Sequence, residues 1–180
     1  MGIGEWVSTS MPYVTPSKQG APDPWTAEAA AAGRRGTQRI VYAGEVAADP
    51  EVAALLGQVE GDTVVVRRRV MYVDDEPCEL TDSYYPAHIA RGTALGGAAK
   101  IPGGAVALLA QLGYAGASVR EDVTARMPSE EERQALHAGD REPVLCLTRL
   151  TLDRHDHPVQ VDTMVMRAQF AWLRYELAIG

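Results

Sequence analysis

The sequence predicts a fold of the α/β (α+β) class, in which short helices pack on a central antiparallel β-sheet. Two hairpin-like stretches, Val64–Pro86 and Val144–Met166, supply four of its strands. Between the strands lie short segments that begin with a helix-capping residue and end near a glycine. The chain has 180 residues, of which 46% are hydrophobic and 23% charged, so it is long enough for one domain of ordinary size with its own core.

The N-terminal residues differ in composition from the rest of the chain. Residues 1–24 are rich in Ser, Pro, Gly and Thr and show no periodicity, which is typical of a flexible tail. Trp6, Met11 and Tyr13 are apolar for a tail, so an arm that docks on the body or on a second subunit is an equal alternative. We therefore divide the chain into an N-terminal arm with a short helix, residues 1–37, and a globular domain, residues 38–180.

Caps and alternation define the elements in order. Asp23 and Asp49, each followed by proline, cap two short helices, and Ser129 with Glu132 forms a capping box for another. The predicted helices are Trp25–Ala32, Pro50–Leu56, Ala87–Ala90, Gly104–Leu112 and Glu130–His137. The predicted strands are Gln38–Gly44, Val64–Val73, Cys78–Tyr85, Tyr114–Arg126, Val144–Leu152 and Val159–Met166, with the tail Phe170–Gly180 as an edge strand.

The two hairpins share one pattern. Arg69–Ser83 and Arg149–Met164 each begin with arginine and continue through an apolar strand, an acidic turn, a proline and a second strand. This pattern indicates one hairpin used twice, related by a pseudo-twofold axis in a single antiparallel sheet. Chance similarity between two short hairpins is the alternative.

Three consecutive arginines interrupt the apolar strand Val64–Val73. Arginine is almost never fully buried without a partner, so these charges need an explanation, and a bound anion is one candidate. Strand alternation places Arg67 and Arg69 on one face, together with Met71, and Arg68 on the other.

Two other strands carry a polar face beside this one. In Cys78–Tyr85 the polar face includes Glu79, Thr81 and Ser83, and in Val159–Met166 a mixed polar and sulfur-bearing face lies opposite a β-branched one. Such faces line a ligand cavity or are the solvent side of a one-sided sheet. The candidate cavity residues on the strands are Arg67, Arg69, Met71, Glu79, Thr81, Ser83, Arg149, Gln160, Asp162, Met164 and Met166.

A glycine-rich loop offers a second wall. Ile101–Gly104 leads directly into the predicted helix Gly104–Leu112. Glycines at a helix start leave the backbone N–H groups uncovered, and the helix dipole favours an anion there. Gly103 and Gly104 are therefore candidates for binding an anion from the side opposite Arg69.

Composition and charge exclude several classes of function. No apolar run approaches the roughly 18 residues of a membrane helix, and the N-terminus lacks the pattern of a secretory signal. The net charge of −7 disfavours direct nucleic-acid binding. Cys78 and Cys146 lie in apolar runs and indicate buried thiols in a reducing cytoplasm. We find no metal-ligand spacing, no cofactor motif and no Ser-His-Asp or Cys-His arrangement.

Four motifs follow one another in an order known from one protein family. They are VVVRRRVMYVDDEPCELTDSYYP, IPGGAVALLAQLGY, ARMPSEEERQALHAGDREPVLCLTRLTLDRHDHPVQVDTMVMRA and RYEL. In this order they resemble the UTRA domain, the effector-binding domain of the HutC subfamily of GntR-type transcriptional regulators. The resemblance implies a chorismate-lyase-like fold with helices on one side of the sheet. It also implies a homodimer that binds small effectors, often phosphorylated sugars or carboxylates, which tune operator binding.

The resemblance also assigns roles to residues. The family's anion-binding arginine corresponds to Arg69. Its other ligand contacts fall on Met71, Thr81, Gly104, Gln160 and Met166. Met71 replaces a second arginine and Thr81 replaces an acidic residue, so the resemblance implies a less polar ligand than a sugar phosphate. Arg67 would then supply the missing charge.

Regulators of this family carry an N-terminal winged-helix domain of at least about 50 residues. Here about 37 residues precede the first predicted strand, without a basic recognition helix. The sequence therefore predicts an effector-binding sensor that acts through a separate DNA-binding partner and does not itself bind nucleic acid or membrane. The alternatives are a chorismate-lyase-like enzyme acting on an aromatic carboxylate and a protein-interaction module with no ligand.

Overall fold

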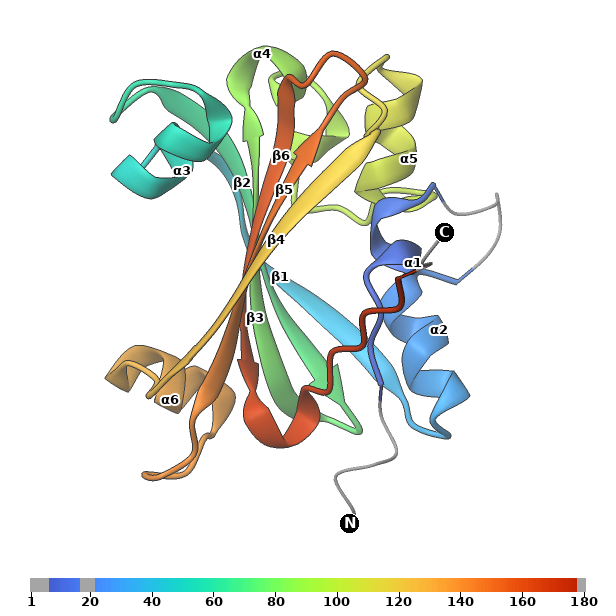
Figure 1. The fold of residues 1–180 in the computed structure, drawn as a ribbon, viewed down its shortest axis with the longest axis vertical. Helices are drawn as coiled ribbons and strands as arrows, with labels where there is room; N and C mark the ends of the chain where they lie inside the picture. Colours follow the sequence, from blue (N-terminus) through green and yellow to red (C-terminus); the bar gives the residue numbers. More distant parts are fainter. Residues whose placement is uncertain (1–6, 17–21, 178–180) are drawn as a thin grey trace.

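The computed structural model of the chain describes residues 7–16 and 22–177. Within them, six strands form one antiparallel sheet in the order β1-β2-β3-β6-β5-β4, so the predicted fold class is confirmed. Figure 1 shows that the sheet is strongly twisted. The strands are β1 (Gly36–Ala47), β2 (Thr63–Val73), β3 (Glu76–Pro86), β4 (Ser118–Arg126), β5 (Val144–Leu152) and β6 (Pro158–Arg167).

Most helices begin where the caps predict. Asp23 and Asp49 accept hydrogen bonds from the third backbone N–H beyond them, and Ser129 and Glu132 form the reciprocal capping box. The last of these helices ends at His137, which takes the left-handed conformation expected of a following glycine. The helices are α1 (Met11–Val14), α2 (Pro24–Ala31), α3 (Pro50–Leu56), α4 (Ala87–Ala90), α5 (Gly104–Gln111) and α6 (Glu130–Leu136).

The two halves of the sheet repeat one arrangement, β1–α3–β2–β3 and β4–α6–β5–β6. They meet where β3 pairs with β6, with Asp82 opposite Thr163. The register repeats as well: Arg69 lies opposite Thr81 in the first half, and Arg149 lies opposite Asp162 in the second. The repeated hairpin predicted from the sequence is therefore present, and it brings the two arginines to equivalent places in one sheet.

Helices cover both faces of the sheet, whereas the family resemblance implied one side. Figure 1 shows α3 and α6 on one face and α1, α2 and α5 on the other. Val64 and Val66 pack in the core cluster under α3, while Val65 packs in the cluster that includes α4 and α5. Both faces of this part of β2 are buried, which explains why its sequence is continuously apolar rather than alternating.

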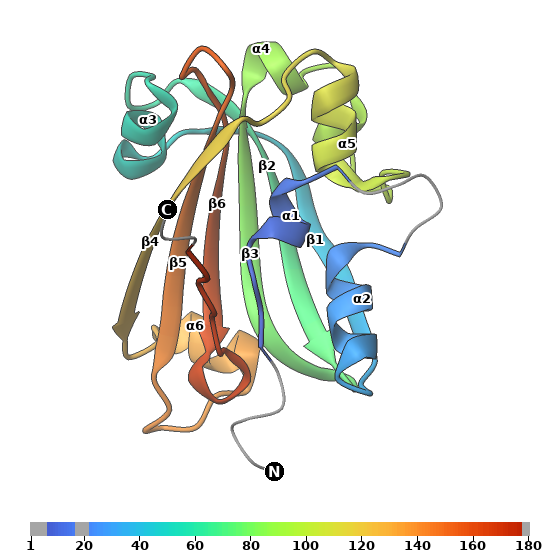
Figure 2. The ribbon, with the colours of Figure 1, turned by 45° about the vertical axis from the view of Figure 1, so that its right-hand side comes forward.

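The C-terminal tail is not the edge strand that we predicted. After the short 3-10 helix Ala168–Phe170, the chain turns back across the sheet and forms one parallel bridge, between Leu173 and Ser8. Ser8 donates its N–H to Trp172 and accepts from Arg174, both at 2.9 Å. Backbone pairing with the N-terminal arm thus replaces pairing with a sheet edge. In Figure 2 the arm and the tail cross the same face of the sheet.

The arm docks on the body, which was one of the two alternatives for residues 1–24. Ser10 Oγ donates a hydrogen bond to Glu121 of β4 at 2.8 Å, and Tyr13 packs against the cluster that contains Trp25. Residues 1–6 and 17–21 of this segment lie outside the described residues. In the part of the chain that the structure describes, no helix is long and apolar enough to span a membrane.

Candidate functional site

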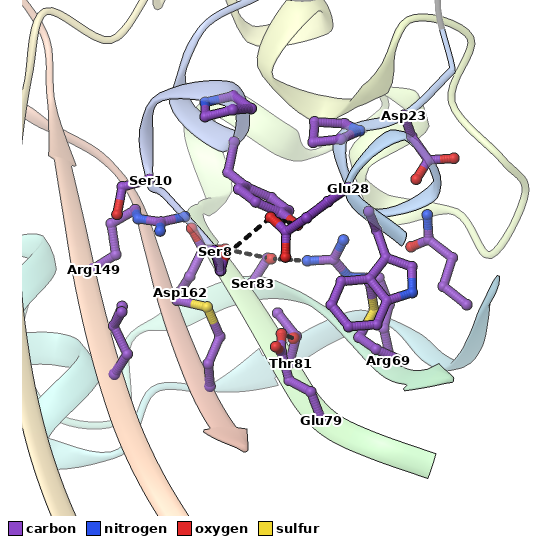
Figure 3. Close-up of a pocket in the computed structure, with 18 of the residues that line it drawn as sticks. Ser8, Ser10, Asp23, Glu28, Arg69, Glu79, Thr81, Ser83, Arg149 and Asp162 are labelled. Atoms are coloured by element: carbon purple, nitrogen blue, oxygen red, sulfur yellow. Dashed lines mark hydrogen bonds between the residues drawn. The ribbon is translucent and has the colours of Figure 1, made fainter. Parts of the chain in front are cut away.

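A cavity of about 180 Å³ lies on the face of the sheet that carries the arm. Its floor is formed by β2, β3, β5 and β6, and its roof by the arm, α2 and the segment after β6 (Figure 3). Twelve of the thirteen predicted site residues line it: Arg69, Met71, Glu79, Thr81, Ser83, Gly103, Gly104, Arg149, Gln160, Asp162, Met164 and Met166. Strand alternation therefore selected the face that lines this cavity on β2, β3 and β6, and the repeated hairpin selected Arg149 on β5.

Arg67 is the exception and corrects our prediction that it adds charge to the cavity. Its guanidinium donates hydrogen bonds to backbone carbonyls of the loop after α4, those of Ala94 and Ala99 at 3.1 Å and that of Gly97. The side chain is only 5% exposed, and this burial lowers the pKa of the guanidinium. Arg67 shares a face with Arg69, but it lies nearer the end of the sheet that this loop covers. Its partners are carbonyl oxygens rather than a ligand.

Arg69, unlike Arg67, lines the cavity. Its Nη2 donates a hydrogen bond to the hydroxyl of Ser83 at 2.8 Å. Its Nε is buried and has no hydrogen-bond partner within the described residues. A buried donor without an acceptor is costly, and a ligand oxygen in the cavity would satisfy it.

Arg149, the equivalent residue in the second half of the sheet, already has a carboxylate partner. Its Nε donates to Glu121 Oε1 at 2.6 Å, and the two side chains are 8% and 7% exposed. Burial would raise the pKa of Glu121, but the hydrogen bonds from Arg149 and Ser10 and the arginine's charge outweigh it and lower this pKa. Because the guanidinium also lies 6.0 Å from the centre of the Tyr13 ring, this pair anchors the arm.

A hydrogen-bonded row joins the polar side chains of β3 and β6. Ser83 donates its hydroxyl to Asp162 Oδ1, and Gln160 Nε2 donates to both oxygens of Asp162 at 2.8 Å. Farther along β3, Thr81 donates to Glu79. Burial raises the pKa of Glu79, while the Thr81 hydrogen bond and the charges of Arg69 and Arg149 act against that rise.

The start of α5 forms a backbone wall of the cavity, and the two predicted glycines, Gly103 and Gly104, are part of it. Gly103 has φ 78°, a conformation that glycine adopts without strain, and no side chain caps the helix. The N–H of Gly104 donates to Ile101 at 2.9 Å and is therefore occupied. The next two residues, Ala105 and Val106, also line the cavity, and N–H groups in a first helical turn have no intrahelical acceptor.

The roof contains the site residues that the sequence prediction missed. Glu28 of α2 accepts hydrogen bonds from Tyr13 at 2.9 Å and from Ser8 at 3.0 Å. Figure 3 shows it reaching between the arm and the sheet. The apolar character of Trp6, Met11 and Tyr13 was the only sequence signal for this docking, and Trp6 lies outside the described residues. The other roof residues include Ser10, Pro12, Trp25, Phe170, Ala171 and Leu173.

The chemistry of the lining favours binding. Met71, Met164 and Met166 supply soft apolar walls and are each less than one-tenth exposed. Burial raises the pKa of the Cys78 thiol, which also lines the cavity. The described residues contain no group of three or more His, Cys, Asp or Glu side chains placed to hold a metal ion.

The chain is similar to known regulatory proteins. It matches the family model of the UTRA domain over residues 31–170. An uncharacterised HTH-type transcriptional regulator of Streptomyces coelicolor is 34% identical over 131 residues, which are 69% of this chain and 48% of the relative. The HTH-type transcriptional regulator GgaR of Escherichia coli K12 is 28% identical over 61% of this chain and 42% of its own length. The chain thus spans about half the length of the curated relatives that it matches.

A solved structure supports the fold. The effector domain of PhnF from Mycobacterium smegmatis superposes with a TM-score of 0.73 and is 22% identical, and the alignment covers 92% of this chain and 99% of that one. At this identity the likeness concerns the fold. The family match covers most of the chain, residues 31–170. The chain therefore belongs to the UTRA family and is a ligand-binding regulatory domain of a transcriptional regulator.

Proposed function

We propose that this domain binds a small effector with an acidic group, a carboxylate or a phosphate, and that Arg69 is the principal contact for that group. The observation that carries the proposal is the buried Nε of Arg69, which has no partner within the described residues. Hydrogen bonds between a charged donor and a charged acceptor are the strong ones, and arginine suits planar acidic groups. The first turn of α5 after Gly104, whose N–H groups have no intrahelical acceptor and no side-chain cap, supports the same acidic group from the other side.

The effector in this proposal is less polar than a sugar phosphate. Met71, which lies opposite Glu79 on the neighbouring strand, and Met166, on the other side of Glu79, give the cavity an apolar section. The small volume of about 180 Å³ also favours a compact molecule.

Within this proposal the domain is a sensor and not a catalyst. Among the described residues, the cavity lining includes no histidine and one thiol, that of Cys78. Burial raises the pKa of this thiol, so it is a poor nucleophile. The enzymatic alternative therefore has no specific observation in its favour. Free Cys78 and Cys146 support a cytoplasmic location.

We further propose that two copies of the domain associate and that they act together with a DNA-binding unit, as the similarity to HTH-type regulators suggests. Native mass spectrometry of the protein purified from its host is expected to show a dimer, a DNA-binding polypeptide and a bound small molecule. A monomer without any companion at micromolar concentration would contradict this part of the proposal.

The role of Arg69 can be tested with simple anions. In an Arg69→Ala variant, the affinity for butyrate or inorganic phosphate is expected to fall by about tenfold to 100-fold, because a charged hydrogen bond contributes on the order of 1.5–3 kcal/mol. The fall would be measured as loss of anion-induced thermal stabilisation. Arg68→Ala is the matched control, since Arg68 is exposed on the opposite face of the same strand. If Arg69→Ala instead prevents folding, or both variants keep full stabilisation, Arg69 is not the anion contact.

A further inference from the structure

The charges around the cavity conflict with a purely anionic ligand. Four carboxylates line it, those of Asp23, Glu28, Glu79 and Asp162, against two guanidinium groups. One of these, Arg149, is already paired with Glu121, which is not part of the lining. Arg69, by contrast, is hydrogen-bonded to a neutral hydroxyl. The cavity therefore has an excess of negative charge, and an anion that approaches Arg69 also meets several carboxylates.

Three of these carboxylates accept hydrogen bonds that hold elements of the fold together. Asp23 caps α2 through the N–H of Thr26. Glu28 holds the arm through Ser8 and Tyr13. The third, Asp162, accepts from Ser83 and Gln160 and joins β3 to β6.

Glu79 differs from the other three. Among the described residues, the hydrogen bond to its carboxylate comes from Thr81, its neighbour two positions along the strand, and does not join it to another element. It lies between Met71 on β2 and Met166 on β6, so no cation stands directly opposite it in the sheet. Burial raises its pKa, and the hydrogen bond from Thr81 and the charges of Arg69 and Arg149 offset this rise only in part. A positively charged ligand group would remove this penalty.

Arg69 and Glu79 lie close enough together for one small ligand to contact both side chains. Arg69 lies opposite Thr81, and Glu79 is two residues farther along the same face of β3. Two residues along a strand correspond to about 7 Å. Figure 3 shows that Arg69 and Glu79 both lie at the floor, while Glu28 faces them from the roof. The aromatic side chains of Tyr13 and Trp25 also line the cavity.

We propose that the effector is a small zwitterion whose acidic group binds Arg69 and whose ammonium group binds Glu79. This inference rests on the proposed function, because it uses the anion contact at Arg69 as one end of the site. The ammonium group offsets the excess of negative charge, and the methylene groups between its two ends lie against the methionine side chains. The class of ligand is therefore an amino acid or a related amine with a carboxylate or a phosphate group.

The contribution of the Glu79 charge to ligand binding can be measured with an uncharged variant of similar shape and three small ligands. We would titrate the wild-type protein and a Glu79→Gln variant with γ-aminobutyrate, butyrate and butylamine by ligand-observed NMR. Glu79→Gln is expected to weaken γ-aminobutyrate binding by about tenfold and to strengthen butyrate binding a few-fold, because it removes one negative charge from the cavity. Glu76→Gln is the control, since Glu76 begins the same strand but is exposed.

The proposed site predicts that Glu79→Gln changes the two affinities in opposite directions: it weakens γ-aminobutyrate binding and strengthens butyrate binding. Wild-type protein that binds butyrate at least as well as γ-aminobutyrate, or a Glu79→Gln variant that leaves both affinities unchanged, would overturn the zwitterion proposal. The Arg69→Ala variant separates this failure from failure of the proposed function. If butyrate binding depends on Arg69 but γ-aminobutyrate binding does not depend on Glu79, the anion site stands and the ammonium site does not. If neither acid depends on Arg69, both proposals fail.

Discussion

Replacing Arg67 with alanine is expected to lower the free energy of unfolding by about 3 kcal/mol or more, because the substitution removes a buried side chain and several charge-assisted hydrogen bonds at once. The guanidinium of Arg67 holds the loop after α4 through Ala94, Gly97 and Ala99, and it is almost completely buried. The loss is expected in urea denaturation as a lower midpoint. A chain that remains folded should also show faster proteolysis in this loop, since the loop has lost its attachment to β2.

The matched control is Arg68→Ala, one residue along the same strand. Arg68 forms an ion pair with Asp82 at 3.2 Å, but its side chain is 47% exposed. Exposed pairs contribute at most about 1 kcal/mol, so the midpoint should change little. Equal losses in the two variants would show that the carbonyl contacts of Arg67 are not what stabilises this region.

Replacing Arg149 with methionine is expected to destabilise the protein by about 3–5 kcal/mol, because it leaves the carboxylate of Glu121 buried without its cation. The pair joins β4 to β5, and Glu121 also accepts the hydrogen bond from Ser10 of the arm. Urea denaturation would measure the loss of stability. Faster cleavage by a protease between Ser8 and Thr15 would report release of the arm.

An exposed ion pair provides the comparison for this variant. Arg91 binds Glu45 through two nitrogens at 2.7 and 2.9 Å, with side chains 61% and 45% exposed. Arg91→Ala should therefore cost at most about 1 kcal/mol. If Arg149→Met lowers the free energy of unfolding no more than Arg91→Ala does, the buried Arg149–Glu121 pair contributes no more to stability than an exposed pair.

The floor of the cavity could be predicted from the sequence because it depends on a local rule. Side chains alternate along a strand, so once β2, β3, β5 and β6 are recognised, the residues that share a face follow. Arg69, Glu79 and Asp162 were assigned in this way, and all three line the cavity. The repeated hairpin also placed Arg149 in the same lining.

The same rule could not separate Arg67 from Arg69. Both have the parity of the cavity face, and they are only two residues apart. What separates them is the loop after α4, which covers the position of Arg67 and offers it four carbonyl oxygens. No local pattern in β2 records where a loop from another part of the chain will lie.

The roof and the charge balance were likewise beyond local rules. Glu28 and Tyr13 meet over the sheet only because the arm folds back and pairs with the tail at Leu173. The sequence by itself determined the strands, the capped helices and the face that bears the polar side chains, because alternation and capping act over a few residues. Only the tertiary structure decided that Arg69 and not Arg67 lines the cavity, and which carboxylates surround it. The residues that decide this come from segments far apart in the chain.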